Sequence, residues 1–379
     1  MNGGMELYLH MPFCVRKCAY CDFLSFPSGA KTQRMYAKRL MEDIGVMGKR
    51  YGEIPVETIF IGGGTPSVPD SGLIVEIMEH VRHAFHVADG AEISMEANPG
   101  TVTREKLTDY RKAGINRLSF GLQSANDREL KLLGRIHTWA EFLESFTLAR
   151  ECGFANLNID LMSALPGQTC ESWKETLSRV TDLDPEHISA YSLIIEEGTP
   201  FGERYGSEEG RKLLPDEDSE REMYHETKRF LKDCGYERYE ISNYAKPGRE
   251  CRHNIGYWTG VPYLGLGLGA SSYLDGCRFT VNPDMKQYLE EKPGMFTDIE
   301  KLTKKDMEEE FFYVGLRMTA GVSLSEFERR FGISAKEVYP GLMETFVKEK
   351  AAHFEGDRFV LTDYGLDVSN YIMAQFLQD

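Results

Sequence analysis

The sequence predicts an α/β protein in which a parallel sheet, closed or partly closed into a barrel, is followed by a small helical domain. Two observations favour this fold class. Six short apolar runs alternate with amphipathic stretches over the first two-thirds of the chain, and polar motifs follow the runs. Repeated strand–helix units form parallel sheets, and functional residues of such barrels lie on loops after the carboxyl ends of strands. The predicted strands are 7–10, 58–61, 92–96, 117–120, 158–161 and 187–193.

The segments between these strands have the apolar periodicity of helices. In the last of them, Trp173, Leu177 and Val180 recur at helical spacing, which places one apolar face towards the sheet. Periodicity does not separate a barrel from an open sheet. The predicted helices are 36–46, 73–85, 104–113, 139–152 and 173–183.

The middle of the chain is less regular. Residues 198–220 are acidic and rich in glycine and proline, which predicts a long surface loop. A helix over 221–234 follows and ends at Gly235, a suitable C-terminal cap. Residues 239–243 are predicted as one more strand, and residues 246–295 as irregular.

The last segment, residues 300–379, reads as a small unit with the element order of a winged helix. Its charge excludes DNA, because 10 Lys and Arg stand against 15 Asp and Glu, a net charge of −5. We therefore expect a packing or lid role. The predicted elements are helices at 307–318, 324–331 and 335–348, a strand at 359–362 and a last helix.

Composition and charge narrow the class of protein. The chain has 379 residues, 41% of them hydrophobic, and a net charge of −16. This is enough apolar material for a large core, and so acidic a chain is a poor general nucleic-acid binder. No stretch approaches the roughly 18 apolar residues of a membrane span, and the N-terminus lacks the zones of a signal peptide. We expect a cytoplasmic protein without a membrane span.

Three of the eight cysteines lie within eight residues. Cys14, Cys18 and Cys21 have the spacing C-x3-C-x2-C, and dense cysteines in a reduced protein usually bind a metal or a cluster. Structural zinc is closed by four protein ligands, whereas a cubane [4Fe-4S] cluster held by three thiolates leaves one iron open. The alternatives are a zinc site completed by His10 or a distant residue, and a chance spacing.

A glycine-rich turn, residues 62–66, follows the second predicted strand. Gly63 and Gly64 let the backbone approach a ligand closely, and Thr65 offers a hydroxyl. The turn lacks the Lys-Ser/Thr pair of a phosphate loop, so a nucleoside triphosphate is disfavoured. A plain tight turn is the alternative.

Four polar residues lie at or just beyond predicted strand ends. Glu96, Gln123, Arg135 and Asp160 supply what an amino-acid-like ligand needs: a carboxylate for its ammonium group, an arginine for its carboxylate, and acceptors for ribose hydroxyls. Any one of them alone would be read as a solvated loop residue. Together, beside an open iron, they favour a binding site.

The segment 253–258 concentrates an imidazole, an amide and two large aromatic rings in His253, Asn254, Tyr257 and Trp258. Such a cluster suits a flat, apolar, iron-bearing ligand with His253 or Cys251 as its axial group. By composition alone a structural loop held by its aromatic rings is favoured.

Two other patterns are discounted. Residues 265–270 superficially match a dinucleotide fingerprint, but no clear strand–turn–helix unit surrounds them, so we interpret them as close backbone packing. His80, His83 and His86 lie three apart on a predicted helix and read as a solvated edge rather than a metal site.

The cysteine spacing resembles the signature of radical S-adenosylmethionine (SAM) proteins. The surrounding sequence is similar to the oxygen-independent coproporphyrinogen III oxidase family over roughly residues 5 to 275. The motifs that carry this resemblance are 8–14, 62–66, 116–124, 134–137, 158–161, 165–168 and 239–243.

Two branches of that family differ next to the cysteines. The oxidase branch has a fourth cysteine two residues after the third, where this chain has Phe23. The haem chaperone branch has a phenylalanine there together with an H-N-x-x-Y-W motif, and residues 253–258 of this chain match it. The resemblance is therefore to the haem chaperone branch.

The resemblance implies a partial (β/α)6, TIM-like barrel over residues 1–245, a connecting region 246–299 and a winged-helix-like domain 300–379. It implies a [4Fe-4S] cluster on Cys14, Cys18 and Cys21, with SAM on the fourth iron. It also turns the 253–258 segment, with His253, Asn254, Tyr257 and Trp258, into a candidate haem site. The positions implied to contact SAM are Tyr8, Gly63, Gly64, Thr65, Glu96, Gln123, Arg135 and Asp160.

The function implied is that of a haem chaperone, which binds haem as cargo and transfers it to acceptor haemoproteins. The alternative is an enzyme of the oxidase branch, in which a radical from SAM starts oxidative decarboxylation of porphyrinogen propionates to vinyls. The expected partners are haem and acceptor haemoproteins. A homodimer is compatible with the sequence, and no nucleic-acid partner is expected.

Overall fold

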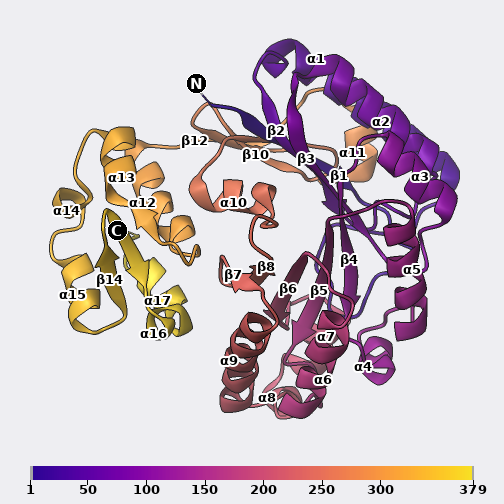
Figure 1. Ribbon diagram of the computed structural model, residues 1–379. Helices are drawn as coiled ribbons and strands as arrows, with labels where there is room; N and C mark the ends of the chain where they lie inside the picture. Colours follow the sequence, from indigo (N-terminus) through magenta and orange to yellow (C-terminus); the bar gives the residue numbers. More distant parts are fainter. Residues whose placement is uncertain (1–2, 378–379) are drawn as a thin grey trace.

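One twelve-stranded mixed sheet runs through most of the molecule (Figure 1). The structure is a computed structural model that describes residues 3–377. Residues 1–2 and 378–379, which the predicted domain limits include, lie outside it. The strand order is β12-β11-β10-β9-β1-β2-β3-β4-β5-β6-β8-β7. The first six strands in chain order are β1 (Met5–Met11), β2 (Val56–Gly63), β3 (Val87–Ala97), β4 (Arg117–Gln123), β5 (Leu157–Ser163) and β6 (His187–Ser192).

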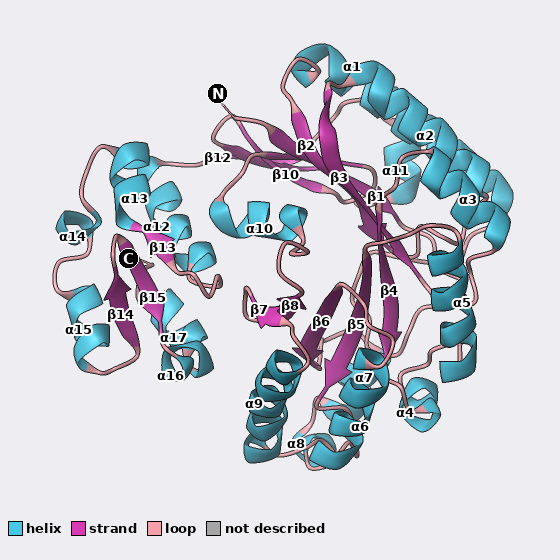
Figure 2. Cartoon of the chain, in the orientation of Figure 1, coloured by secondary structure: helices cyan, strands magenta, loops and turns pink. Residues whose placement is uncertain are grey.

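Strands β1 to β6 run parallel to one another, β6 pairs antiparallel with β8, and helices cover the outer face of the parallel strands (Figure 2). The sheet does not close, because β1 is flanked by β9 and β6 by β8. The predicted α/β class and the partial barrel are confirmed. The helices between the strands are α1 (Ala30–Tyr51), α2 (Ser71–Ala84), α3 (Arg104–Lys112), α4 (Asp127–Leu132), α5 (Trp139–Glu151) and α6 (Cys170–Thr181).

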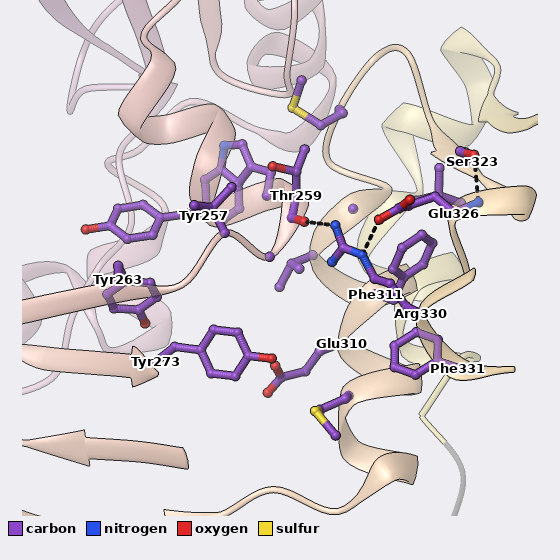
Figure 3. A pocket seen from close by; sticks show the side chains of 18 of the residues that line it. Tyr257, Thr259, Tyr263, Tyr273, Glu310, Phe311, Ser323, Glu326, Arg330 and Phe331 are labelled. Carbon is purple, nitrogen blue, oxygen red and sulfur yellow. Dashed lines mark hydrogen bonds and ion pairs between the residues drawn. The ribbon is translucent and has the colours of Figure 1, made fainter. Parts of the chain in front are cut away.

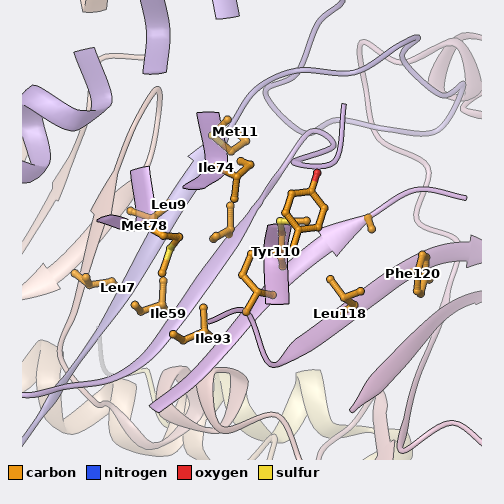
Figure 4. Close-up of a cluster of buried hydrophobic side chains, with 14 of the residues drawn as sticks. Leu7, Leu9, Met11, Ile59, Ile74, Met78, Ile93, Tyr110, Leu118 and Phe120 are labelled. Atoms are coloured by element: carbon orange, nitrogen blue, oxygen red, sulfur yellow. The ribbon is translucent and has the colours of Figure 1, made fainter. Parts of the chain in front are cut away.

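The core lies between the sheet and these helices (Figure 4). Leu7 and Leu9 on β1 and Ile59 on β2 point into it and are fully buried, as the two-residue period of a strand requires. Several helices begin at a side-chain cap: Thr138 and Glu141 form a capping box at the start of α5, which satisfies amides that the first turn leaves free.

Residues 198–220 are not the surface loop that composition predicts. They hold α7 (Pro200–Tyr205) and α8 (Glu208–Arg211), and α9 (Glu217–Asp233) begins before the predicted 221. The side chains of Phe201 and Tyr205, four residues apart, are buried in a small apolar cluster. Two aromatic rings on one helical face therefore outweigh the glycine, proline and acidic content.

The strand predicted at 239–243 is instead mostly the turn between β7 (Glu237–Arg238) and β8 (Asn243–Ala245), and only Asn243 lies in one of these strands. The buried Glu240 carboxylate closes this turn by accepting from the Ser242 amide at 2.7 Å and from the Asn243 side chain at 2.6 Å. The carboxylate supplies hydrogen bonds that a strand would take from a neighbour.

Residues 246–295, predicted as irregular, are structured. Strand β9 pairs in parallel with β1, so the region extends the barrel sheet. The predicted close packing at 265–270 is confirmed, because a Cβ on Gly265 would lie 2.2 Å from the carbonyl oxygen of Ser271. The elements are α10 (Arg252–Thr259), β9 (Tyr263–Leu266), β10 (Ser271–Leu274), β11 (Cys277–Thr280) and α11 (Met285–Glu290).

The C-terminal unit has its own core and follows β12 (Thr297–Lys301). Phe312 and Phe376 stack there with ring centroids 4.4 Å apart. The helix predicted over 335–348 is broken at Pro340 and Gly341, where Gly341 has a φ of 75°. The elements are α12 (Lys304–Gly315), β13 (Val322–Ser323), α13 (Leu324–Phe331), α14 (Ala335–Val338), α15 (Leu342–Lys348), β14 (Ala352–Glu355), β15 (Arg358–Leu361), α16 (Asp363–Asp367) and α17 (Ser369–Ala374).

This order of helices with a three-stranded sheet, β13-β15-β14, agrees with the predicted winged-helix-like arrangement. Within residues 3–377, no helix is both long enough and apolar enough to cross a membrane.

Candidate functional site

A cavity of 410 Å³ lies at the carboxyl ends of the parallel strands. The structure brings together there all the residues predicted for the cluster and for SAM. Most of them come from the loop after β1 and from β2 to β5 near their carboxyl ends, because parallel strands end at one rim of a barrel. Tyr8 lies within β1, and Arg135 lies in the loop after α4 and not at a strand end. These lining residues are Tyr8, Cys14, Cys18, Cys21, Gly63, Gly64, Thr65, Glu96, Gln123, Arg135 and Asp160.

The three cysteines lie on the loop after β1 and are free thiols. Cys14 Sγ lies 3.6 Å from the Thr65 hydroxyl, and a guanidinium nitrogen of Arg135 donates to Cys18 Sγ over 3.6 Å. Thiolates are stabilised by such neighbouring donors and cations. The loop therefore presents its sulfur atoms to the cavity beside one fixed positive charge.

The zinc alternative does not fit this geometry. Among residues 3–377, no three His, Cys, Asp or Glu side chains are gathered closely enough for a single metal ion. His10 is also engaged, with Nδ1 3.0 Å from the Tyr8 hydroxyl and Nε2 2.9 Å from the carbonyl oxygen of Leu24. A cubane cluster has no such requirement, because each thiolate binds a different iron.

The glycine turn after β2 is packed against the strand that leads to the cysteines. A Cβ on Gly63 would lie 2.5 Å from the His10 ring, and one on Gly64 would lie 2.7 Å from the carbonyl oxygen of Phe13. The Thr65 amide donates to that same carbonyl at 2.7 Å. Glycine is thus required at both positions because residues 63–64 pack directly against residues 10–13. The sequence alone does not show this packing.

Two half-buried carboxyl groups face the cavity. Burial and the neighbouring Asp160 raise the pKa of Glu96 to about 8, against the Gly63 amide, which donates to its carboxylate at 2.9 Å. Burial also raises the pKa of Asp160, although Ser119 and Asn158 donate to it at 3.0 and 2.7 Å. Two acids that resist ionisation together suit a ligand that brings positive charge.

Arg135 joins the cysteine loop to the strand ends. It donates to the Asn98 amide oxygen at 2.7 Å and to the carbonyl of Gly121, and Asn98 in turn donates to the Thr65 hydroxyl at 2.9 Å. Gln123 has a positive φ of 75° and accepts from the Tyr191 hydroxyl at 3.1 Å. Strained backbone at a non-glycine residue is typical of functional positions.

The segment 253–258 forms most of helix α10, and its four predicted residues face different ways. His253 is 1% exposed, and both ring nitrogens are hydrogen-bonded, Nδ1 to the Thr58 hydroxyl at 2.7 Å and Nε2 to the Tyr257 hydroxyl at 2.9 Å. His253, Asn254 and Tyr257 line the cysteine cavity, whereas Trp258 does not.

A second, larger cavity of 830 Å³ lies on the other side of α10, between strands β9 to β11 and helices α12 and α13 (Figure 3). Trp258 lines it, and Tyr8 and Tyr257 line both cavities. These two tyrosines therefore form the wall between the cavities.

Comparisons with known proteins match this architecture. The model of the radical SAM superfamily matches residues 8–180, and that of the HemN C-terminal domain matches residues 302–368. The heme chaperone HemW of Bacillus subtilis is 35% identical over 98% of each chain. That of Escherichia coli is 34% identical over 99% of this chain and 98% of its own. The chain belongs to the HemW family of radical SAM proteins. The expected resemblance to the haem chaperone branch is confirmed.

Among solved structures, coproporphyrinogen III oxidase (HemN) from Escherichia coli, described as a radical SAM enzyme, superposes with a TM-score of 0.84. The match covers 99% of this chain and 90% of that chain at 24% identity. At this level of identity the likeness shows the fold that the HemW family shares with that enzyme.

Membership of the radical SAM superfamily implies a [4Fe-4S] cluster and SAM. The donor set fits both groups. Three free thiols and Arg135 line the cavity, together with Glu96 and Asp160, whose raised pKa values a cationic ligand would lower again.

Sequence reasoning missed several residues of this HemW-family site. Asn98 bridges Arg135 and Thr65, and Arg117, 2% exposed, places a cation at the floor of the cavity. A charged residue at the start of an otherwise apolar strand was the available signal for Arg117. No signal pointed to the second cavity, since segments distant in sequence form it.

Proposed function

We propose that the protein is a haem chaperone that binds haem and transfers it to acceptor haemoproteins. The observation that carries this proposal is its similarity, over nearly the whole of both chains, to proteins named as heme chaperones. The larger cavity supports it, because a planar, largely apolar cargo needs a chamber of sufficient size lined by aromatic side chains, and this cavity is separate from the one beside the cysteines.

Within this proposal, Cys14, Cys18 and Cys21 bind a [4Fe-4S] cluster, and SAM takes the open iron. Glu96 and Asp160 offer carboxylates to the ammonium group and the ribose, and Arg135 neutralises charge beside the cluster. Tyr8, Gly63, Gly64, Thr65 and Gln123 complete the SAM contacts. When bound, the cluster and SAM together supply one-electron chemistry, but we assign them a structural or regulatory role here.

The H-N-x-x-Y-W motif serves the haem side of the proposal. His253 holds the Tyr257 hydroxyl at 2.9 Å, and it acts by positioning that ring. Asn254 faces the cysteine cavity, while Trp258 faces the larger one. The motif thereby lies between the proposed SAM site and the space available for cargo.

Haem uptake and release test the function. Purified protein with a reconstituted cluster is mixed with haem, and the Soret band is followed by titration and then after addition of an apo-haemoprotein. We expect saturable uptake and transfer of the band to the acceptor. A preparation with intact cluster that takes up no haem would refute the proposal.

The same preparation tests the alternative function, that of an oxygen-independent coproporphyrinogen III oxidase. Under anaerobic conditions with coproporphyrinogen III, a reductant and SAM, an oxidase releases two molecules of carbon dioxide per product formed. We expect none, because Phe23 stands where the oxidase branch has its fourth cysteine.

The remaining parts of the proposal concern organisation. We infer a barrel domain over 1–245, a connecting region over 246–299 and a C-terminal domain over 300–379, with the last two bordering the larger cavity. All eight cysteines are free, which suits the reducing cytoplasm. A homodimer would appear as doubled mass in light scattering.

A further inference from the structure

The larger cavity has an aromatic lining from both sides (Figure 3). The Tyr257 and Tyr263 rings meet edge to face with centroids 4.7 Å apart, and the ring of Tyr273 follows 6.4 Å from Tyr263. Phe311 and Phe331 face them from the C-terminal unit, with centroids 6.0 Å apart. Aromatic surfaces on opposing walls suit a flat, conjugated ligand.

Helix α12 has two apolar faces. One face, with Phe312 and the adjoining Leu316, packs in the C-terminal core. The other points into the cavity, at helical spacing and continuing past the end of the helix. Phe311 on this face also packs against the edge of the C-terminal core, but the face as a whole lines a cavity of 830 Å³, and an apolar helix face that lines a cavity indicates a ligand or partner. Its residues are Met307, Phe311, Val314 and Met318.

The lining also carries a positive balance, with four cationic side chains against the carboxylates of Glu310 and Glu326. Arg278 uses Nε and one terminal nitrogen for the Glu310 carboxylate, at 3.1 and 2.6 Å. Arg330 uses Nε for Glu326 and one terminal nitrogen for the carbonyl of Thr259 at 3.0 Å. Its other terminal nitrogen donates to no group within the described chain. Arginines with spare donors bind carboxylates. The four cations are Arg278, Lys304, Arg330 and Arg358.

Trp258 adds an unpartnered polar group. Its indole Nε1 is buried, and within residues 3–377 it has no hydrogen-bond partner. Buried polar groups in native proteins are nearly always paired, so this nitrogen is an unsatisfied donor on a ring that lines the cavity.

Donors for iron are restricted in this cavity. Of the described residues that line it, none is a histidine or a cysteine, whereas Met307 and Met318 offer thioethers. Burial raises the pKa of Tyr263 and Tyr273, which keeps both phenols neutral. His253 is committed to Thr58 and Tyr257. A thioether is an established axial ligand of haem iron.

We propose that haem binds in the cavity between α10 and α12, with a thioether of Met307 or Met318 on its iron and its propionates towards Arg278 and Arg330. This inference rests on the proposed chaperone function and names its cargo site. The macrocycle lies between the tyrosines of the sheet and the phenylalanines of the C-terminal unit. His253 orients the wall of the site and does not ligate iron.

A filling substitution tests the location. Val314→Trp places an indole into the cavity from α12, while Tyr313→Trp places the same ring on the exposed side of the helix, where Tyr313 is 42% exposed. Each protein, with its cluster reconstituted, is titrated with haem and separately with SAM. We expect V314W to weaken haem affinity at least tenfold, with unchanged iron content and SAM affinity, and Y313W to match the wild type.

A second variant tests the ligand without filling space. Met307→Leu/Met318→Leu is close to isosteric, so it keeps the fold, and it decides the question if V314W lowers the melting temperature. We expect the near-infrared magnetic circular dichroism signature of thioether ligation to disappear. His253→Gln should retain that signature.

The outcomes separate the two proposals. Absence of haem uptake by the wild type refutes the chaperone function itself. Uptake by the wild type with unchanged affinity in V314W, or with ligation lost in H253Q and kept in the double methionine variant, overturns this location and leaves the function standing.

Discussion

Glu96 makes SAM binding dependent on pH. In the ligand-free protein its pKa is raised to about 8 by burial and by Asp160, so at pH 7 only about one carboxyl in eleven is ionised. The ligand ammonium needs the ionised form, and each pKa unit costs about 1.4 kcal/mol. Because the ionised fraction rises with pH, we expect the apparent Kd to fall about ninefold between pH 6 and pH 7. The ligand's own amino group stays protonated over this range.

Isothermal titration calorimetry in buffers of different ionisation enthalpy measures the effect directly. At pH 7 the wild type should release about 0.9 proton on binding SAM, and Glu96→Gln should release none through this site and show a Kd nearly independent of pH. Glu105→Gln, an exposed change on α3, is the control and should follow the wild type. Equal pH slopes in wild type and E96Q would refute the argument.

The same carboxyl acts on stability with the opposite sign to an ordinary surface acid. Unfolded, it loses its proton near 4.5, whereas in the folded chain it keeps the proton to about 8. Between these values the folded state binds more protons, so its stability falls as pH rises. Thermal melts of ligand-free E96Q should therefore show less of this decline than the wild type.

Two further predictions use matched pairs. Cys18→Ala should lower iron from about four per chain to below one and abolish the cluster absorbance, whereas Cys234→Ala, at an exposed thiol, should leave both unchanged; equal iron in the two variants would contradict the cluster assignment. Gly256→Ala places a Cβ 1.9 Å from the Glu6 carboxylate and should destabilise the protein by about 1–3 kcal/mol in urea unfolding. Gly45→Ala, with open space around it in α1, should stabilise by about 0.5–1 kcal/mol, and a reversed order would show that α10 relaxes freely.

Much of the barrel was predictable because its signals are local. Each parallel strand is a short apolar run with its own boundaries, and each helix carries its own periodicity, as at Trp173 and Leu177. The rim site followed from the same logic. Cys14 follows β1, Glu96 lies near the end of β3 and Asp160 lies within β5, and parallel topology brings the carboxyl halves of these strands together.

The remainder depends on partners that are distant in sequence. Strand β9 is four residues long and contains Gly265, so its propensity is weak, and it forms by pairing with β1. The turn before Asn243 depends on the burial of Glu240, and no local sequence pattern predicts that burial. The second cavity needs α10, the β9–β11 sheet and α12 placed around one space. Tertiary contacts, and not propensity, determine these features.

The wall made by Tyr8 and Tyr257 is a single layer of side chains shared by two chambers. A rotation of either ring that widens one cavity narrows the other. A ligand in one cavity therefore changes the free energy of ligand binding in the other. Thermodynamic linkage makes that effect mutual: the factor by which the first occupant alters the affinity of the second equals the factor in the reverse direction. Through this shared wall, ligand binding in one cavity can depend on whether the other cavity is occupied.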